Sequence, residues 1–209
     1  MKVKEFYEKW EANNRRKYSG EVVTDFRIRE ILKCCRKFGL RKILDVGSGY
    51  GYYAKCLSSR GLDVVGGDIS SANVEYAKLE NPGPRYLVNN FEESVLAEKF
   101  DVIYAFDVIE HVFDYDKFVQ NCYSMLNDGG MLFISTQNAY APKKKINFFF
   151  NREWKLDLVS KHHVHFFGPF TLKKVLMDNG FGAVRLVGTG KLFWLGMGFS
   201  GNMLGIARK

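Results

Sequence analysis

Proline and cysteine are both scarce in this chain of 209 residues. It contains only 4 prolines and 4 cysteines, so proline falls well below its typical share of ~5%. This composition excludes collagen-like and proline-rich disordered chains. The cysteines show no C-x-x-C spacing and no framework of the disulfide-rich kind, which argues against a small secreted scaffold. We therefore expect reduced thiols and a cytoplasmic protein.

Long apolar runs are lacking as well. The most apolar stretch, residues 192–207, is interrupted by glycines, by Ser200 and by Asn202, so it predicts a β-hairpin and not a membrane span. The first ten residues contain no apolar region of the secretory type. No internal repeat or low-complexity tract is present. These absences predict a folded domain with no membrane partner.

What remains is the composition of an ordinary globular domain, with 46% hydrophobic and 26% charged residues. Strand and helix patterns alternate along residues 42–135, which is typical of a doubly wound parallel sheet. We expect strands at 42–46, 63–67, 86–88, 100–105, 131–135, 181–187 and 203–208. We expect helices at 3–18, 22–38, 52–59, 115–126 and 171–179, and one capped by Ser70 or Ser71. The predicted fold is an α/β, Rossmann-like, mostly parallel seven-stranded sheet with helices on both faces and an antiparallel terminal strand pair.

The expected elements divide a single domain into four parts. These are N-terminal helices at 1–40, a cofactor-binding core at 41–138, a substrate lid at 139–167, and a C-terminal helix and strand pair at 168–209. A connection as long as the third part is usually functional, because connections have a median of ~4–6 residues. It carries Lys143–Lys145, Phe148–Phe150 and Trp154. These side chains fit a lid that closes over a substrate, and a solvated loop is the alternative.

A glycine turn follows the first strand of the core. The sequence LDVGSGYG at 44–51 contains G-x-G-x-G, and glycine lets a ligand reach the backbone amides of a helix N-terminus. Tyr52 stands where the G-x-G-x-x-G fingerprint of nicotinamide enzymes needs its third glycine. Asp45 would repel a pyrophosphate but suits an ammonium group. The turn therefore predicts a nucleoside ligand that carries a cation.

The acidic residue and the G-x-G-x-G turn resemble the first motif of class I S-adenosylmethionine-dependent methyltransferases. The resemblance covers residues 41–138 and implies S-adenosylmethionine as the cofactor. In this family an acidic residue like Asp68 binds the ribose hydroxyls, and a pair like Asn90-Phe91 recognises and covers adenine. The implied cofactor-binding set is Asp45, Gly47, Ser48, Gly49, Gly51, Asp68, Ile69, Asn90, Phe91 and Phe106. A Rossmann sheet that binds another ligand is the alternative.

Two further motifs resemble the branch that includes ubiquinone-biosynthesis O-methyltransferases. They are DVIEHV at 107–112 and HVHFF at 163–167. A histidine with a pKa near neutrality can take the proton that an oxygen or nitrogen acceptor loses. The candidates are His163, His165 and His111, and for each of them a purely structural role is the alternative. His162, His163 and His165 with Glu110 match no defined zinc spacing, so we expect no metal.

Charge is divided unevenly along the chain. Residues 1–43 hold 13 basic and 6 acidic side chains, residues 44–138 hold 6 and 14, and residues 139–209 hold 12 and 3. Basic flanks fit either solvated helix faces or attraction of an anionic substrate. We expect methyl transfer to an O or N atom of a small, anionic acceptor. An RNA methyltransferase and a non-catalytic cofactor-binding protein are the alternatives, and the oligomeric state stays open.

Overall fold

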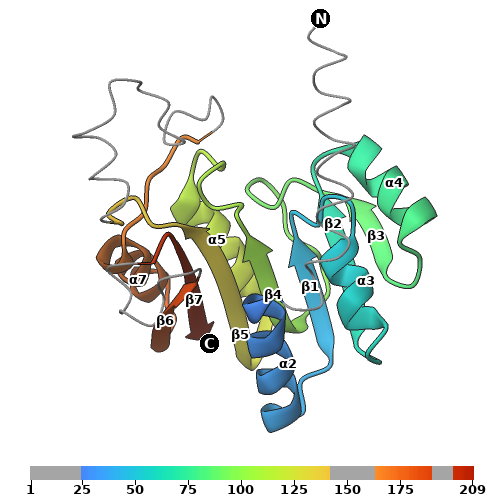
Figure 1. Ribbon diagram of the computed structural model, residues 1–209, viewed down its shortest axis with the longest axis horizontal. Helices are drawn as coiled ribbons and strands as arrows, with labels where there is room; N and C mark the ends of the chain where they lie inside the picture. The colour runs from blue at the N-terminus through green and yellow to red at the C-terminus, as the bar shows by residue number, and fades with distance from the viewer. Residues whose placement is uncertain (1–24, 142–162, 190–199) are drawn as a thin grey trace, which may run out of the picture.

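The computed structural model describes residues 25–141, 163–189 and 200–209, and a seven-stranded sheet lies at its centre (Figure 1). The strand order is β3-β2-β1-β4-β5-β7-β6. The strands are β1 (Lys42–Val46), β2 (Asp63–Asp68), β3 (Arg85–Val88), β4 (Phe100–Phe106), β5 (Leu126–Gln137), β6 (Ala183–Thr189) and β7 (Asn202–Arg208). The predicted seven-stranded sheet is therefore confirmed.

Strands β1 to β5 are parallel, and β1 lies between β2 and β4. Leu44 of β1 pairs with Val65 of β2 on one side and with Ile103 of β4 on the other. The chain first builds the sheet outward through β2 and β3, then returns to the other side of β1. In such sheets, ligands bind outside the carboxyl ends of the strands at the point where the order reverses. The fold thus places the glycine turn after β1 at this switch point.

The last two strands form the predicted antiparallel pair. Val187 of β6 pairs with Leu204 of β7. Strand β7 also pairs antiparallel with β5, where Ile134 faces Gly205. Strand β7 therefore lies between β5 and β6, and β6 forms the edge of the sheet. The connection expected to close a hairpin falls at 190–199, outside the described residues.

Helices cover both faces of the sheet, as predicted (Figure 1). One face carries α2 (Phe26–Phe38), α3 (Tyr52–Ser58) and α4 (Ser71–Glu80), and the other carries α5 (Tyr115–Met125) and α7 (Pro169–Asp178). Ile28, Ile31 and Cys35 share one side of α2, because residues three or four apart face the same way on a helix. They belong to the apolar core on that face of the sheet. Phe118 of α5 and Leu172 of α7 belong to the opposite core.

Two boundaries differ from the prediction by more than two residues. The helix expected at 22–38 begins at Phe26, because Asp25 has extended backbone and its carboxylate accepts a hydrogen bond from Arg27 N at 2.8 Å. Residues 22–24 lie outside the described part. Strand β5 begins at Leu126 and not at residue 131, because Leu126 has extended backbone and pairs with Phe100. The register then shifts before Met131 pairs with Val102, and Gly129 has a φ of 77°. Residues 127–130 therefore form an irregular start of the strand.

Most of the predicted lid lies outside the described residues. Only its two ends are described, at 139–141 and 163–167. Ala139 N donates to Phe167 O at 2.9 Å, so these ends lie side by side next to β5. The expected helix at 3–18, Lys143–Lys145, Phe148–Phe150, Trp154 and His162 also fall outside. All four cysteines are buried and free, and within the described ranges no helix has the length and apolar character needed to cross a membrane.

Candidate active site

The glycine turn is fixed to the carboxyl end of β2 by backbone hydrogen bonds. Gly47 N and Ser48 N both donate to Gly67 O, at 2.8 and 3.0 Å. Gly49 N donates to Asp68 Oδ2 at 2.8 Å. The turn is therefore held in one shape before any ligand arrives.

Glycine is required in this turn because all three glycines have positive φ angles, of 74°, 51° and 78°. A Cβ atom on Gly47 would lie 2.5 Å from Val108 Cγ2, and one on Gly51 would lie 2.5 Å from Tyr86 Oη. Around Gly49, by contrast, a Cβ atom would meet nothing within 4 Å. Gly49 thus leaves an open path along which a ligand could approach the backbone.

Asp45 precedes the turn on β1 and is only 3% exposed. Burial raises the pKa of its carboxyl to about 8; the Tyr104 phenol opposes this shift and the Asp68 charge adds to it. Among the described residues, neither Asp45 Oδ2 nor Ser48 Oγ has a hydrogen-bond partner. An ammonium group would satisfy the Asp45 acceptor and return the carboxyl to its ionised form. The site therefore fits the predicted cation-bearing ligand.

Asp68 ends β2 and is buried. Besides the bond from Gly49 N, its carboxylate accepts hydrogen bonds from Ser70 N at 2.9 Å and from Asn73 Nδ2 at 3.3 Å. The side chain thus joins the glycine turn to the first turn of α4. Each carboxylate oxygen has two acceptor positions, so the predicted binding of ribose hydroxyls stays open to it as a further role.

A cavity of about 290 Å³ lies beside Asp68 and the glycine turn. Six of the predicted site residues line it: Gly47, Asp68, Ile69, Asn90, Phe91 and His111. Val108, Val112, Phe113 and Phe118 supply further apolar walls. Ile69 is 69% exposed and Phe113 is 80% exposed, which is unusual for large apolar side chains. A cavity with apolar walls and a few polar groups suits a nucleoside.

Sequence reasoning missed two residues that shape this cavity. The Glu92 carboxylate accepts hydrogen bonds from Phe113 N at 3.1 Å and from Asp114 N at 2.9 Å. Asn121 on α5 donates through Nδ2 to Phe91 O at 2.9 Å. Together they hold the segment after β3 against the segment after β4. In the sequence both look like ordinary polar surface, so no local signal could have identified them.

The turn after β4 is held by a network that also involves α2. Asp107 has a φ of 57°, which is unusual for a residue other than glycine. Arg27 Nη1 donates to Asp107 Oδ2 at 2.8 Å and to Ser135 Oγ at 3.0 Å. The Arg27 guanidinium lies 4.6 Å from the ring centroid of Phe106, which also packs edge-to-face on Tyr53. Phe106 does not line the cavity beside Asp68, and its predicted contact with the cofactor stays a prediction.

The structure brings two of the three candidate histidines together. The rings of His111 and His163 lie 4.7 Å apart between centroids, and both histidines have a ligand atom within 4.8 Å of the Glu110 carboxylate. Val164 N donates to Glu110 O at 2.9 Å, which fixes the end of the lid at this point. His111 also lines the cavity described above. The cluster therefore lies at the edge of the cofactor cavity.

His165 has different surroundings. Its Nε2 atom lies 3.0 Å from Phe113 O, and its ring packs edge-to-face on Tyr115. His163 and His165 both border a narrow cavity of about 10 Å³ that Glu110 also lines. Both histidines therefore border one small cavity next to Glu110. The ring of His165 is held mainly by the loop after β4.

The Glu110, His111 and His163 cluster could also hold a divalent metal ion. It offers one carboxylate and two imidazole ligands, a donor set that zinc and other divalent metals accept. This set differs from the one considered from the sequence, because His111 replaces His162 and His165. The expectation that the protein uses no metal stays a prediction.

Comparisons with known proteins identify the family of the chain. A methyltransferase domain model matches residues 11–186. The ubiquinone biosynthesis O-methyltransferase of Chelativorans sp. (strain BNC1) is 39% identical over 105 residues, which cover 48% of this chain and 41% of that protein. The mitochondrial ubiquinone biosynthesis O-methyltransferase of Homo sapiens is 33% identical over 158 residues, which cover 70% of this chain and 43% of that protein.

A solved structure supports the fold. The crystal structure of magnesium protoporphyrin IX methyltransferase from Synechocystis PCC 6803, with bound SAH, matches with a TM-score of 0.65 and 19% identity. The match covers 87% of this chain and 81% of that one. The chain spans less than half the length of the two relatives named above. Because the family model covers well over half of the chain, the chain belongs to the methyltransferase domain family, in the S-adenosylmethionine-dependent class that its motifs predicted.

Proposed function

We propose that this protein transfers a methyl group from S-adenosylmethionine to an oxygen or nitrogen atom of a small, anionic acceptor. One observation carries the proposal. His111 lines the cavity beside Asp68 and also lies against His163 and Glu110. Groups that can accept a proton therefore lie at the edge of the cavity that fits the nucleoside. Such an arrangement supports catalysis over simple storage of the cofactor.

The contacts around the glycine turn support specific cofactor-binding roles. Asp45 would accept a hydrogen bond from the amino group of the ligand, and Ser48 Oγ offers a further polar contact. Asp68 would receive the ribose hydroxyls, while Asn90 and Phe91 would recognise and cover the base. Gly49 keeps the path to the backbone open. These roles use the buried acceptor atoms and the apolar walls that the fold supplies.

The chemical step needs little from the protein beyond orientation and removal of a proton. When bound, S-adenosylmethionine supplies a methyl group that is already electrophilic. Positioning the acceptor behind that group supplies ~7–11 kcal/mol of the barrier reduction. His163 would accept the proton that the acceptor loses as the new bond to carbon forms, and His111 and Glu110 would orient it. His165 would hold the adjoining loop in place through Phe113.

Oxygen is the favoured acceptor atom. The two curated relatives named above are both O-methyltransferases by name. A hydroxyl acceptor must lose its proton, which agrees with the placement of the histidine cluster. The basic character of residues 139–209, with 12 basic and 3 acidic side chains, supports a negatively charged acceptor.

An acceptor screen with methyl-labelled S-adenosylmethionine would test the proposal. The panel would contain phenols and catechols with and without a carboxylate, small amines, and total RNA. We expect label in a carboxylated phenol or catechol, with less in its uncharged counterpart. The Gly49→Val variant, which blocks the cofactor path, is the control for background methylation.

Two results would overturn the proposal. Label in RNA alone would identify the protein as an RNA methyltransferase. Binding of S-adenosylhomocysteine, the demethylated product, without methylation of any acceptor class in the panel would favour a non-catalytic binding protein.

A further inference from the structure

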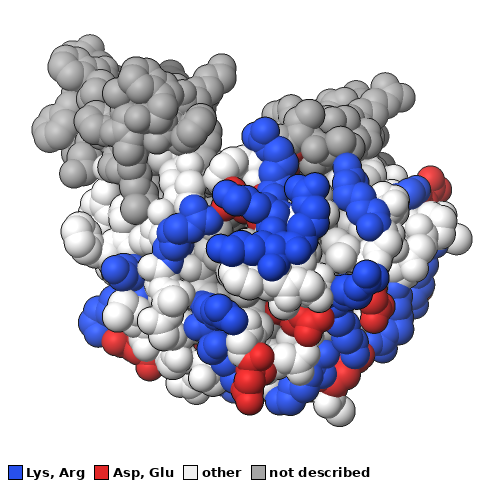
Figure 2. Space-filling model, turned by 90° about the horizontal axis from the view of Figure 1, so that it is seen from below, with Lys and Arg blue, Asp and Glu red and all other residues white. Residues whose placement is uncertain are grey.

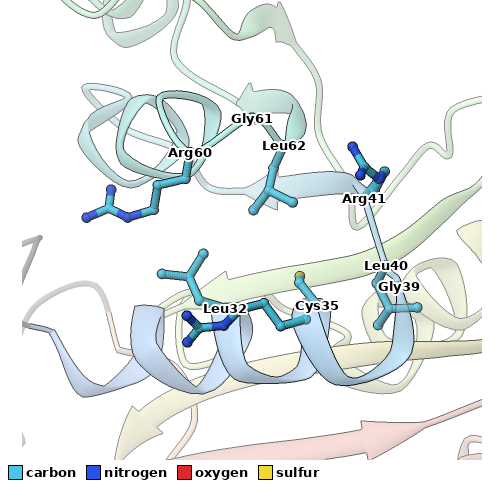
Figure 3. A pocket seen from close by; sticks show the side chains of 9 residues that line it. Leu32, Cys35, Gly39, Leu40, Arg41, Arg60, Gly61 and Leu62 are labelled. Atoms are coloured by element: carbon cyan, nitrogen blue, oxygen red, sulfur yellow. The ribbon is translucent and has the colours of Figure 1, made fainter.

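A second cavity lies at the opposite edge of the sheet, before the start of β1. Its volume is about 530 Å³, which is in the usual range for small-molecule sites. It lies between the C-terminal ends of α2 and α3 and the residues that lead into β1 and β2. Leu32 of α2 and Leu62 face one another across it, and Arg60 and Arg41 lie toward its two ends (Figure 3).

Three arginines, Arg36, Arg41 and Arg60, are among the residues that line this cavity, and all three are exposed. Within the described part of the chain, none of the three forms an ion pair. Arg60 Nη1 donates only to Cys56, at O and at Sγ. By contrast, Arg27 and Arg185 are each paired with a carboxylate of another element. Three unpaired cations around one cavity repel one another, so a bound anion would stabilise the arrangement.

No carboxylate of the described residues forms an ion pair with these arginines. Asp101 Oδ2 accepts hydrogen bonds from the backbone, from Arg41 N and Lys42 N at 3.0 Å. The C-terminal ends of α2 and α3 also point toward the cavity, and each contributes about half a negative charge at most. The residues that line the cavity include three arginines and no acidic residue, so its lining is positively charged.

The surroundings reinforce this positive character. The face of the molecule seen from below in Figure 1, where α2 and α3 end, is rich in lysine and arginine side chains (Figure 2). Lys33 and Lys37 of α2 line a neighbouring cavity on the other side of the same helix. An anion that approaches this face is attracted before it reaches the three arginines.

The floor of the cavity is apolar. Leu32, Leu40 and Leu62 are half-buried there, and Cys35 is 5% exposed. Gly39 and Gly61 leave the cavity open, because a Cβ atom on either would meet nothing within 4 Å. A ligand that carried only charge would leave the leucines in contact with water. A ligand with both an anionic group and an apolar body would cover the floor and pair with the arginines.

We propose that this cavity is a binding site for an organic phosphate with an apolar body. A phosphate monoester offers several acceptor oxygens, and guanidinium groups bind such oxygens with paired hydrogen bonds. The site is distinct from the proposed active site, because the two lie at opposite ends of β1. Five strand residues separate them by about 15 Å. The ligand bound there is therefore not the methyl acceptor.

Calorimetric titration of the full chain with hexyl phosphate, hexanol and inorganic phosphate would test this proposal. We expect hexyl phosphate to bind more tightly than inorganic phosphate, and hexanol to show no binding at the same concentrations. The Arg36→Ala/Arg60→Ala variant should lose at least tenfold in affinity for hexyl phosphate. Removal of two guanidinium contacts accounts for a loss of that size. The matched control is Lys78→Ala/Lys173→Ala, which removes the same charge from exposed positions on α4 and α7.

Binding of S-adenosylhomocysteine would report whether each variant is folded, and it should be unchanged in both. An equal loss of hexyl phosphate affinity in the lysine control would overturn the proposal, because net charge alone would then explain binding. Displacement of hexyl phosphate by S-adenosylhomocysteine would also overturn it. Binding to vesicles that contain phosphatidylglycerol, with none to hexyl phosphate, would assign the face to a lipid surface and reject a free phosphate ligand.

Discussion

The two ends of strand β1 differ in charge and in how that charge is held. At the carboxyl end, Asp45 is buried with a pKa raised to about 8 by burial, and Asp68 accepts hydrogen bonds from backbone amides. At the amino end, Arg36, Arg41 and Arg60 line a cavity, and none of them forms an ion pair among the described residues. One strand therefore presents a site for a cationic ligand at one end and a site for an anionic ligand at the other.

The separation between the ends determines how far each site acts on the other. Charges about 15 Å apart along a strand lie beyond the Debye length of ~8 Å at physiological ionic strength. The fields of the two sites are therefore largely screened from one another at the surface. A change at one end should alter binding there and leave the other end unaffected. Paired variants, one at each end, test this independence.

The largest difference between the ends is expected from a valine substitution at matched glycines. Gly49 and Gly39 both have positive φ, of 51° and 70°, and both have open space around a Cβ atom. Each substitution should cost ~1–3 kcal/mol of backbone strain. Gly49→Val should abolish S-adenosylhomocysteine binding, because the side chain enters the ligand path. Gly39→Val should leave that binding unchanged, as measured by calorimetry on protein whose folding is checked by circular dichroism.

If Gly49→Val binds S-adenosylhomocysteine as well as Gly39→Val does, the ligand does not pass over this turn. The cofactor site would then have to be sought elsewhere along the switch point.

The next largest effect concerns the histidines of the carboxyl end. His163→Ala should reduce kcat by about 10²–10⁴-fold, as is usual when a general base is lost, and should leave S-adenosylhomocysteine affinity unchanged. His165→Ala should reduce kcat less, because its ring contacts Phe113 O and Tyr115 and not the Glu110 cluster. Steady-state rates with the acceptor found in the screen would measure both. A double variant with full activity would show that both histidines only pack the lid.

A third effect follows from the raised pKa of Asp45. If only the ionised carboxylate binds the amino group of the ligand, S-adenosylhomocysteine affinity should rise about tenfold per pH unit between pH 6 and pH 8. Binding at pH 7 should also release a proton, which calorimetry in buffers of different ionisation enthalpy would detect. Asp45→Asn should remove both the proton release and the pH dependence. Equal proton release by wild type and Asp45→Asn would assign the proton to another group.

The raised pKa of Asp45 also makes the stability of the folded state depend on pH. The pKa of Asp45 is about 8 in the folded protein and ~3.9 in an unfolded chain. The folded state therefore binds more protons between these values, and the contribution of Asp45 to the free energy of unfolding falls as pH rises from about 4 to about 8. Denaturant titrations at a series of pH values would isolate this contribution. The change in the free energy of unfolding with pH should differ between wild type and Asp45→Asn only between about pH 4 and about pH 8.

The sequence predicted the carboxyl end far better than the amino end. Asp45, the glycine turn and Asp68 are local patterns, each within a few residues of a strand end, so their chemistry could be inferred from spacing. Arg36, Arg41 and Arg60 come from a helix end, a loop and another helix end, and only the packing of α2 against α3 brings them together. No periodic pattern marks such a cluster.

The contrast between local sequence patterns and contacts made by packing also explains what else the sequence did not predict. Arg27 reaches Asp107 across 80 positions in the sequence, and the Glu92 contacts join two segments that follow different strands. Strand β5 begins earlier than predicted because Leu126 pairs with Phe100, a tertiary contact that local sequence does not reveal. Local sequence therefore predicted the strand ends and the glycine turn, and missed contacts made between elements.

The smallest difference between the ends is expected from alanine substitutions at two carboxylates, Asp68 and Asp101. Both accept hydrogen bonds from backbone amides. Asp68 binds Gly49 N and Ser70 N at the carboxyl end, and Asp101 binds Arg41 N and Lys42 N at the amino end. Each substitution by alanine removes charge-assisted hydrogen bonds worth about 1.5–3 kcal/mol. Both variants should lose thermal stability, but Asp68→Ala alone should weaken S-adenosylhomocysteine, by tenfold or more. Melting curves and calorimetry on the two proteins separate the structural loss, which they share, from the ligand contact, which only Asp68 would make. Equal S-adenosylhomocysteine affinity in the two variants would place the ribose hydroxyls away from Asp68 and leave its carboxylate as a tether of the glycine turn.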